Sequence, residues 1–347
     1  MPHKFTTLKD VALKAQTTVA TASFVLNGSK NRYITAELRD RVEKAAQELN
    51  YVKHGAAGSL KGKKTGIIAF ISPQYGNHYF SDIFVAIEQI LHENGYVLAT
   101  LNTFDDANRE KYAINQMTRL RVDGLLIIPT IGGGTNTEHI RTLDIPFVAV
   151  ERPINGVCQD EYDFISSDNF GATYALTKHA LECGHRNIAL AYWESDISMA
   201  IYNLKDRKAG YLTAMQEYGI DGNPLIFGGD ILREEGARIT ASILKEKNEE
   251  KNITAIVYSH YILAEGGIQY LRKKGIRIPD DISVLFLGAP YWTGMSEIDF
   301  THVIQPGAEI GRQAAMALID RIDGHKRENL STVIPAKFHK GESVLRR

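Results

Sequence analysis

The first fifty residues carry apolar side chains at helical spacing, three or four positions apart, in three consecutive short segments. Each segment follows a threonine that can cap the free backbone N–H groups of a helix, namely Thr7, Thr18 and Thr35. Only a short polar break, residues 16–18, separates the first two segments. The pattern predicts a three-helix unit whose first two helices form a helix-turn-helix.

The second of these helices is expected to have two faces. Its inward positions, at helical spacing, are Val19, Ala22, Val25 and Leu26. Four other residues are left to face outward: Ala20, Thr21, Phe24 and Asn27. A helix of this size fits the major groove of B-DNA, so the outward side chains are candidates for contacts with bases.

From residue 65 onward, short apolar runs rich in β-branched residues alternate with helical stretches. The runs predict strands at 66–71, 97–102, 124–128 and 147–150, and again at 188–192, 225–227, 255–258 and 283–287. Buried strands that alternate with helices indicate parallel sheets covered on both faces. We therefore expect an α/β fold with two doubly wound lobes, and a ligand site outside the carboxyl ends of their strands.

Charge separates the N-terminal unit from the rest of the chain. Residues 1–64 hold 12 Lys and Arg against 5 Asp and Glu, a net charge of +7, whereas the whole chain has a net charge of −1. This asymmetry predicts a polyanionic partner for the N-terminal unit alone. The sequence has neither a secretory signal nor an apolar run of the roughly 20 residues that span a bilayer, which predicts a cytoplasmic protein without a membrane partner.

Motifs of enzymes and cofactor sites are absent from the sequence. Gly132-Gly133-Gly134 is not the glycine pattern of a dinucleotide or P-loop site, and no nucleophile elbow or paired zinc ligands occur. Cys158 and Cys183 lack a C-x-x-C spacing and are expected to be reduced and buried. His78, His139, His179 and His185 are expected at helix ends or on the surface. The sequence therefore predicts a protein that is not an enzyme, with no catalytic residue, metal or cofactor.

Short motifs along nearly the whole chain resemble the LacI/GalR family of transcriptional regulators. They include Asp10-Val11-Ala12, Val19-Ala20-Thr21, Val25-Leu26-Asn27-Gly28, Leu49-Asn50-Tyr51, Val122-Asp123-Gly124, Glu151-Arg152-Pro153 and Gln305-Pro306. The resemblance implies a DNA-binding headpiece at 1–52, a hinge helix or linker at 53–64, and an effector-binding and dimerisation domain at 65–347. It implies a repressor that binds a near-palindromic operator as a homodimer. A periplasmic-type binding protein without a DNA role is the alternative, because the fold of the body permits it.

The resemblance also implies which headpiece residues contact double-stranded DNA. They are Thr7, Thr18, Val19, Ala20, Thr21, Ser23, Phe24, Asn27, Tyr51 and Leu60. Val19 and Ala20 match positions that set base preference, and their apolar side chains favour a thymine methyl group. Phe24 stands where the family usually has Arg or His, so the usual guanine contact is lost. Leu60 matches the leucine that wedges into the minor groove, in a hinge that Gly55 and Gly58 are expected to leave disordered without DNA.

In the body, the resemblance implies a periplasmic-binding-protein-like fold. Its first lobe is expected at 65–164 and 298–326, and its second at 165–297 and 327–347. The residues expected to contact an effector are Tyr79, Phe80, Glu151, Arg152, Trp193, Arg207, His260 and Gln305.

Two departures from the family pattern bear on the effector. His260-Tyr261 replaces the usual Asn-Asp, and Gly288-Ala289 removes a carboxylate that commonly holds sugar hydroxyls. Aromatic residues are expected to gather at strand ends: Tyr192, Trp193, Tyr258, Tyr291 and Trp292. These features argue against a simple monosaccharide and favour a larger glycoside, a sugar acid or another cyclic metabolite. The overall expectation remains a carbohydrate-like effector: a sugar, a glycoside or a sugar acid.

Overall fold

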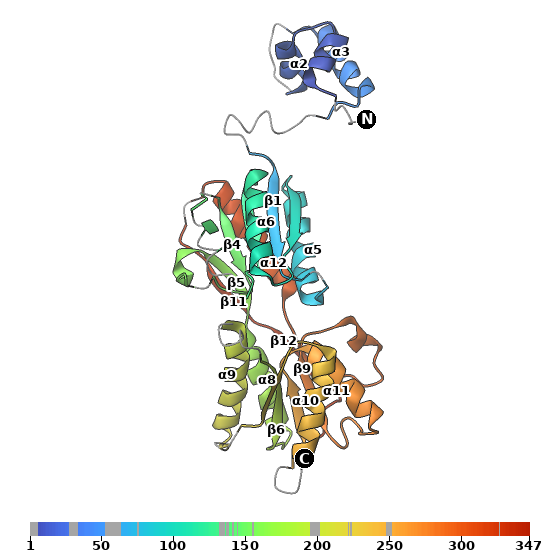
Figure 1. Ribbon diagram of the computed structural model, residues 1–347, viewed down its shortest axis with the longest axis vertical. Helices are drawn as coiled ribbons and strands as arrows, with labels where there is room; N and C mark the ends of the chain where they lie inside the picture. Colours follow the sequence, from blue (N-terminus) through green and yellow to red (C-terminus); the bar gives the residue numbers. More distant parts are fainter. Residues whose placement is uncertain are drawn as a thin grey trace. The chain divides into compact units, whose positions relative to one another are not determined.

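The computed structural model describes residues 6–27, 34–52, 64–74, 76–131, 136, 139–140, 142–143, 145–154, 156–194, 202–220, 222, 224–247, 252–325 and 327–347. The chain forms two compact units, Met1–Thr65 and Gly66–Arg347, which are considered separately (Figure 1). None of the described helices is both long enough and apolar enough to cross a membrane.

The N-terminal unit contains three helices: α1 (Leu8–Lys14), α2 (Val19–Leu26) and α3 (Ala36–Glu48). All three predicted caps form, because the side chains of Thr7, Thr18 and Thr35 accept hydrogen bonds from backbone N–H groups of the first helical turn. Small and β-branched side chains fill the core: Val11, Ala12, Ala15, Ala22, Val25, Val42, Ala45 and Ala46. The predicted helix-turn-helix is therefore present.

One prediction for α2 is wrong. Val19 was expected to face inward, but 45% of its surface is exposed, whereas Ala22 and Val25 are buried. Val19 is the first residue of α2, so it lies in the first helical turn, before the buried residues Ala22 and Val25. It lies beside the exposed Thr18 and Ala20 instead of in the core.

The first lobe of the larger unit is a fully parallel sheet. Its strands are β1 (Ile67–Ser72), β2 (Val97–Asn102), β3 (Gly124–Ile127), β4 (Phe147–Val150), β5 (Asp163–Ser167) and β11 (Ser331–Ile334), in the order β11-β5-β4-β3-β1-β2. Helices α5 (His78–Glu93) and α12 (Gly307–Ile322) pack on one face, and α6 (Ala107–Arg119) packs on the other. Apolar side chains of the strands and of these helices form the two cores between the layers.

The second lobe repeats the scheme with one antiparallel edge. Its strands are β6 (Ile188–Trp193), β7 (Ile226–Gly229), β8 (Ala255–Tyr258), β9 (Ser283–Leu287), β10 (Thr301–Ile304) and β12 (Lys337–His339), in the order β12-β10-β9-β8-β6-β7. Only β12 is antiparallel to its neighbour. Helices α8 (Asn169–Glu182) and α9 (Tyr202–Glu217) cover one face, while α10 (Arg233–Glu246) and α11 (Tyr261–Lys273) cover the other.

The expected lobe boundaries differ from the observed strand pairing. β10, expected in the first lobe, pairs with β9 of the second, and β11, expected in the second lobe, pairs with β5 of the first. β5 itself was expected to straddle the boundary and lies wholly in the first sheet. The chain therefore crosses between lobes after β5, between β10 and α12, and between β11 and β12. Each crossover begins at the end of a strand and not within it.

Candidate effector cavity and DNA-binding surface

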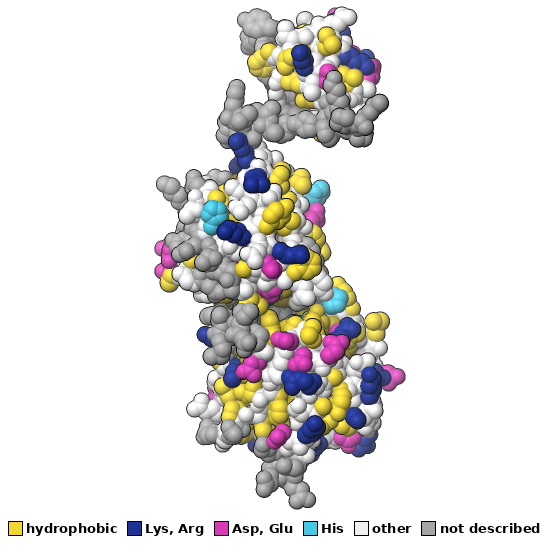
Figure 2. Space-filling model, viewed as in Figure 1, with side chains coloured by type: hydrophobic (Ala, Val, Ile, Leu, Met, Phe, Trp, Pro, Cys, Tyr) yellow, Lys and Arg dark blue, Asp and Glu magenta, His cyan; other side chains and the backbone are white. Residues whose placement is uncertain are grey.

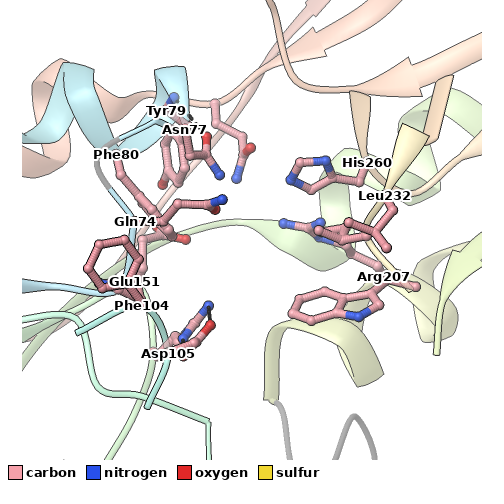
Figure 3. Close-up of a pocket in the computed structure, with 15 residues that line it drawn as sticks. Gln74, Asn77, Tyr79, Phe80, Phe104, Asp105, Glu151, Arg207, Leu232 and His260 are labelled. Atoms are coloured by element: carbon pink, nitrogen blue, oxygen red, sulfur yellow. Dashed lines mark hydrogen bonds and ion pairs between the residues drawn. The ribbon is translucent and has the colours of Figure 1, made fainter. Parts of the chain in front are cut away.

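A cavity of about 310 Å³ opens where the carboxyl ends of strands from both lobes face each other (Figure 3). All eight residues predicted to contact an effector line it: Tyr79, Phe80, Glu151, Arg152, Trp193, Arg207, His260 and Gln305. Seven residues that the sequence analysis did not single out complete the lining: Pro73, Gln74, Asn77, Phe104, Asp105, Ile231 and Leu232. The cavity volume is at the lower end of the range for small-molecule sites.

Arg207, from α9, reaches into the cavity from the second lobe (Figure 3). Its Nε donates to Asn169 Oδ1 at 2.8 Å, and its Nη1 donates to the Ser259 carbonyl at 2.9 Å. Burial lowers the pKa of Arg207, and the nearby Glu151 opposes that shift, so the guanidinium stays charged. Nη2 forms no hydrogen bond with the described residues, which leaves it available to a ligand.

His260 lies on the same wall of the cavity and caps α11. Its Nδ1 accepts a hydrogen bond from the backbone N–H of Ile262 at 3.2 Å. Burial, helped by the charge of Arg207, lowers the pKa of His260 to about 3. The ring is therefore neutral near pH 7, and because Nδ1 is an acceptor, its proton is on Nε2. His260 thus offers a hydrogen-bond donor to a ligand.

Glu151 follows β4 on the opposite lobe, and its backbone has a positive φ of 61°. Its carboxylate accepts hydrogen bonds from the Ser167 backbone N–H at 2.6 Å and the Ser167 hydroxyl at 3.3 Å. Burial raises the pKa of Glu151, although the Tyr79 and Ser167 groups beside it favour its ionised form. The same burial, with the charge of Glu151, raises the pKa of the Tyr79 phenol. Glu151 is therefore committed to protein partners.

Arg152, the next residue, is held by Asp105. Its Nη1 and Nη2 donate to the two oxygens of Asp105 at 2.7 and 3.1 Å, and Nη1 also donates to the Pro129 carbonyl at 3.1 Å. Asp105 additionally accepts from the backbone N–H of Ile131 at 3.0 Å. The pair joins the loops that follow three strands of the first sheet, β2, β3 and β4, and so shapes one wall of the cavity.

Aromatic rings line the cavity from both lobes. Tyr79 and Phe80 begin α5, with ring centroids 5.7 Å apart, and Trp193 ends β6. Phe104, after β2, is 65% exposed and has the Arg109 guanidinium 4.8 Å from its ring centroid. Such rings supply flat apolar surfaces for a cyclic ligand.

The expected aromatic cluster at the strand ends is only partly present. Of its five members, Trp193 alone lines this cavity. Tyr192 is in the core of the second lobe, and the buried Tyr258 hydroxyl is 2.8 Å from the Thr240 hydroxyl. Trp292 packs on Phe286 and donates to Glu265, while Tyr291 contacts the His78 ring at 4.3 Å. Trp193 is the last residue of β6, so it reaches the cavity at the carboxyl end of the strand, whereas Tyr192 stays in the core beside it.

Seven of the DNA-binding candidates lie on α2 or cap one of its ends. Thr18, Val19 and Ala20 are exposed side by side, and Phe24 is 49% exposed. Two hydrogen bonds brace this surface: Thr18 Oγ1 lies 2.9 Å from Thr21 Oγ1, and Asn27 Nδ2 donates to Ser23 Oγ at 3.1 Å.

The other candidates for DNA contact occupy different positions. Thr7 caps α1 through a reciprocal pair of hydrogen bonds with Asp10, and Tyr51 is half-buried against the headpiece core. Leu60, and with it the hinge glycines Gly55 and Gly58, lie outside the described residues.

Two expectations about other side chains are wrong or only partly right. Cys158 is exposed and Cys183 is half-buried, so neither is a buried core residue. His185, expected at a helix end or on the surface, does follow the C-terminus of α8 but is fully buried, with Nδ1 2.7 Å from the Thr254 hydroxyl and Nε2 3.1 Å from the Ser283 hydroxyl. Two hydroxyl partners satisfy a neutral imidazole, which makes its burial tolerable. No group of metal-ligating side chains occurs within the described ranges.

Comparison with known proteins gives matches to both units. Residues 7–54 match the family described as "Bacterial regulatory proteins, lacI family", and residues 177–344 match a "Periplasmic binding protein-like domain". The chain is 29% identical to the HTH-type transcriptional repressor PurR of Haemophilus influenzae (strain PittEE) over 326 residues, 93% of each chain.

Solved structures show the same fold. The Lac repressor dimer bound to operator and the anti-inducer ONPF has a TM-score of 0.82 at 22% identity, covering 99% of this chain and 100% of that one. The complex of the transcriptional regulator CelR with cellobiose has a TM-score of 0.71 at 24% identity, covering 97% and 99%.

Proposed function

Because the chain belongs to the LacI/GalR family of DNA-binding transcriptional regulators, we propose that it represses its target genes under the control of a carbohydrate-like effector bound in the cavity between its lobes. The observation that carries this proposal is the composition of the cavity wall. Arg207 and His260 come from the second lobe, whereas Tyr79 and Phe80 come from the first. A ligand that contacts both sides has a different affinity for each relative orientation of the lobes, and that difference is what couples binding to a conformational equilibrium.

On DNA, the chain acts as a homodimer whose two headpieces bind the halves of a near-palindromic operator. The exposed Thr18, Val19 and Ala20 at the start of α2 suit a helix that enters the major groove with its N-terminal end. Val19 and Ala20 would contact thymine methyl groups, and Phe24 cannot make a bidentate contact with guanine. Thr7, Thr21, Ser23, Asn27, Tyr51 and Leu60 would position the headpiece on phosphates and at the centre of the site.

In the cavity, the aromatic residues Tyr79, Phe80, Phe104 and Trp193 would pack on the ring of the effector. Arg207, His260 and Gln305 would orient its polar groups. Glu151 and Arg152 would act mainly by holding the wall in place, since both are engaged with Ser167 and Asp105. The cellobiose complex of a protein with the same fold supports a carbohydrate-like effector.

A DNA partner places the protein in the cytoplasm, and we propose that the cavity binds its effector without turnover. The alternative, a periplasmic-type binding protein without a DNA role, predicts no sequence preference on DNA. The test is selection of binding sites from a randomised palindromic DNA pool with the full chain, with and without added sugars. Enrichment of one palindrome, with affinity that falls steeply as salt rises, is expected. Salt-sensitive binding without any enrichment contradicts the proposal.

A further inference from the structure

The charged groups that line the cavity are not equally available to a ligand. Asp105 is occupied by Arg152 and by the Ile131 N–H, and Glu151 accepts two hydrogen bonds from Ser167. Both carboxylates lining the cavity are thus committed within the protein. An effector that presents hydroxyl donors to a free carboxylate would find none here among the described residues.

Donor groups face the cavity instead. Arg207 is 7% exposed, and its Nη2 has no hydrogen-bond partner among the described residues, although two partners fix the rest of its guanidinium. His260 presents its Nε2 proton on the same wall, because Nδ1 is taken by the Ile262 N–H. A buried cation with a free N–H edge beside a neutral N–H donor is suited to a pair of anionic oxygens.

Three helices add to the positive potential. The residues that cap the N-termini of α5, α10 and α11, namely Asn77, Leu232 and His260, all line the cavity. A helix N-terminus carries about half a positive charge, and Leu232 has no side chain that could accept a hydrogen bond from the first turn of α10. Elsewhere on the visible face of the second lobe, acidic and basic side chains are interspersed (Figure 2).

We infer that the effector is a cyclic organic acid, whose carboxylate or phosphate group binds at Arg207 and His260 while its ring packs among Phe80, Phe104 and Trp193. This inference rests on the proposed role of the cavity as the effector site. It makes a sugar acid or sugar phosphate a better ligand than the corresponding neutral sugar.

The direct test uses the unaltered full chain and pairs of ligands that share a sugar ring, one with an acid group and the other neutral. Isothermal titration calorimetry compares glucuronate with glucuronamide, galacturonate with galactose, and glucose 6-phosphate with glucose. At least one acid is expected to bind about tenfold more tightly than its neutral counterpart, a difference of about 1.4 kcal/mol. The carboxylate and phosphate pairs tell which acid group is preferred. Equal or tighter binding of the neutral partners, or no binding of any acid at millimolar concentration, overturns the inference.

A pair of variants tests whether Arg207 is responsible for the preference for the acid. Arg207→Gln is expected to abolish the preference for the acid, whereas Arg238→Gln removes an exposed arginine of the same lobe, paired with Glu235, and should retain it. Circular dichroism checks that both variants are folded. If Arg207→Gln does not fold, the comparison of ligand pairs on the unaltered chain still tests the inference. Operator binding by the same preparation is measured in a separate experiment, which tests the proposed function. If the effector is neutral, this inference is wrong, but the proposed function still holds.

Discussion

At the scale of single residues, Gln16 has a strained backbone conformation that lowers the stability of the helix-turn-helix. It lies in the turn between α1 and α2 with a φ of 51°, a left-handed conformation that costs a residue with a side chain roughly 1–2 kcal/mol. Glycine adopts this backbone conformation without that cost, because it has no Cβ.

Replacing Gln16 with glycine should therefore stabilise the headpiece. We expect Gln16→Gly to raise its free energy of unfolding by about 0.5–1 kcal/mol, after the extra entropy of glycine in the unfolded chain is subtracted. Amide hydrogen exchange of headpiece residues measures this. The matched control, Gln47→Gly on the exposed side of α3, should lower stability by about 1 kcal/mol. Destabilisation by both substitutions would show that the turn is not strained.

Asp163 is a second residue whose substitution is expected to change the free energy of unfolding strongly. Its carboxylate is buried and accepts hydrogen bonds from Arg321, Arg327 and the Leu330 N–H. Burial alone would raise the pKa of Asp163, but the hydrogen bonds from Arg327 and Arg321 outweigh it and lower the pKa. Asp163→Asn should cost about 3 kcal/mol near pH 7, because two half-buried arginines lose their counter-charge.

The pH dependence of this loss has a definite sign. A depressed folded-state pKa contributes stability that is complete above the unfolded value of about 3.9 and disappears as the pH falls through the folded value. Urea denaturation should therefore show the deficit of Asp163→Asn shrinking below about pH 4. The exposed control Asp320→Asn should stay within about 0.5 kcal/mol of the unaltered chain at every pH. A pH-independent deficit at Asp163 would mean that packing, not charge, is responsible.

At the scale of elements, predominantly apolar strands were predictable, whereas strands beside the crossovers that mix polar with apolar residues were not. All eight predicted strands occur, because runs such as that of β1 or β9 are buried along most of their length. β5, β10, β11 and β12 were missed as separate strands. They mix polar with apolar residues, and the sheet that each one joins is decided by pairing with distant segments. The lobe boundaries were misplaced for the same reason.

Helix α2, the proposed recognition helix, gives a prediction about base preference. Phe24 is exposed on it, where an arginine could reach the edge of a guanine. Phe24→Arg should add a preference for G at one position of each half-site, seen by repeating the selection from randomised DNA. Leu13→Arg, at an exposed site of α1, adds the same charge and should strengthen binding without changing the selected sequence. An unchanged sequence for Phe24→Arg would place α2 differently on DNA.

At the scale of the whole unit Gly66–Arg347, the sequence predicted residues that the structure brings to one cavity, and it did not predict how those side chains are engaged. Strand-end positions and the family resemblance together brought the eight candidates to one cavity. The same rule could have found Gln74 after β1 and Phe104 after β2. The pairing of Arg152 with Asp105 depends on three loops meeting in space, and no local pattern reveals it. These partnerships decide which lining residues remain free for a ligand.

The two lobes also contact each other outside the lining of the cavity. His78 at the start of α5 packs edge-on against Tyr291 of the second lobe, with ring centroids 4.3 Å apart. Contacts of this kind depend on the relative orientation of the lobes, and an effector between them shifts the balance through its own contacts.

The central claim is that occupancy of the cavity controls binding to DNA. It is tested most directly by measuring operator affinity by fluorescence anisotropy, with and without the probe sugar or sugar acid that binds most tightly, for the unaltered chain and for Arg207→Gln. We expect the ligand to change the operator affinity of the unaltered chain by about 5- to 150-fold, a coupling of about 1–3 kcal/mol. Arg207→Gln should bind the operator equally well without ligand and lose that response. A ligand that binds the unaltered chain and leaves its operator affinity unchanged would contradict the account.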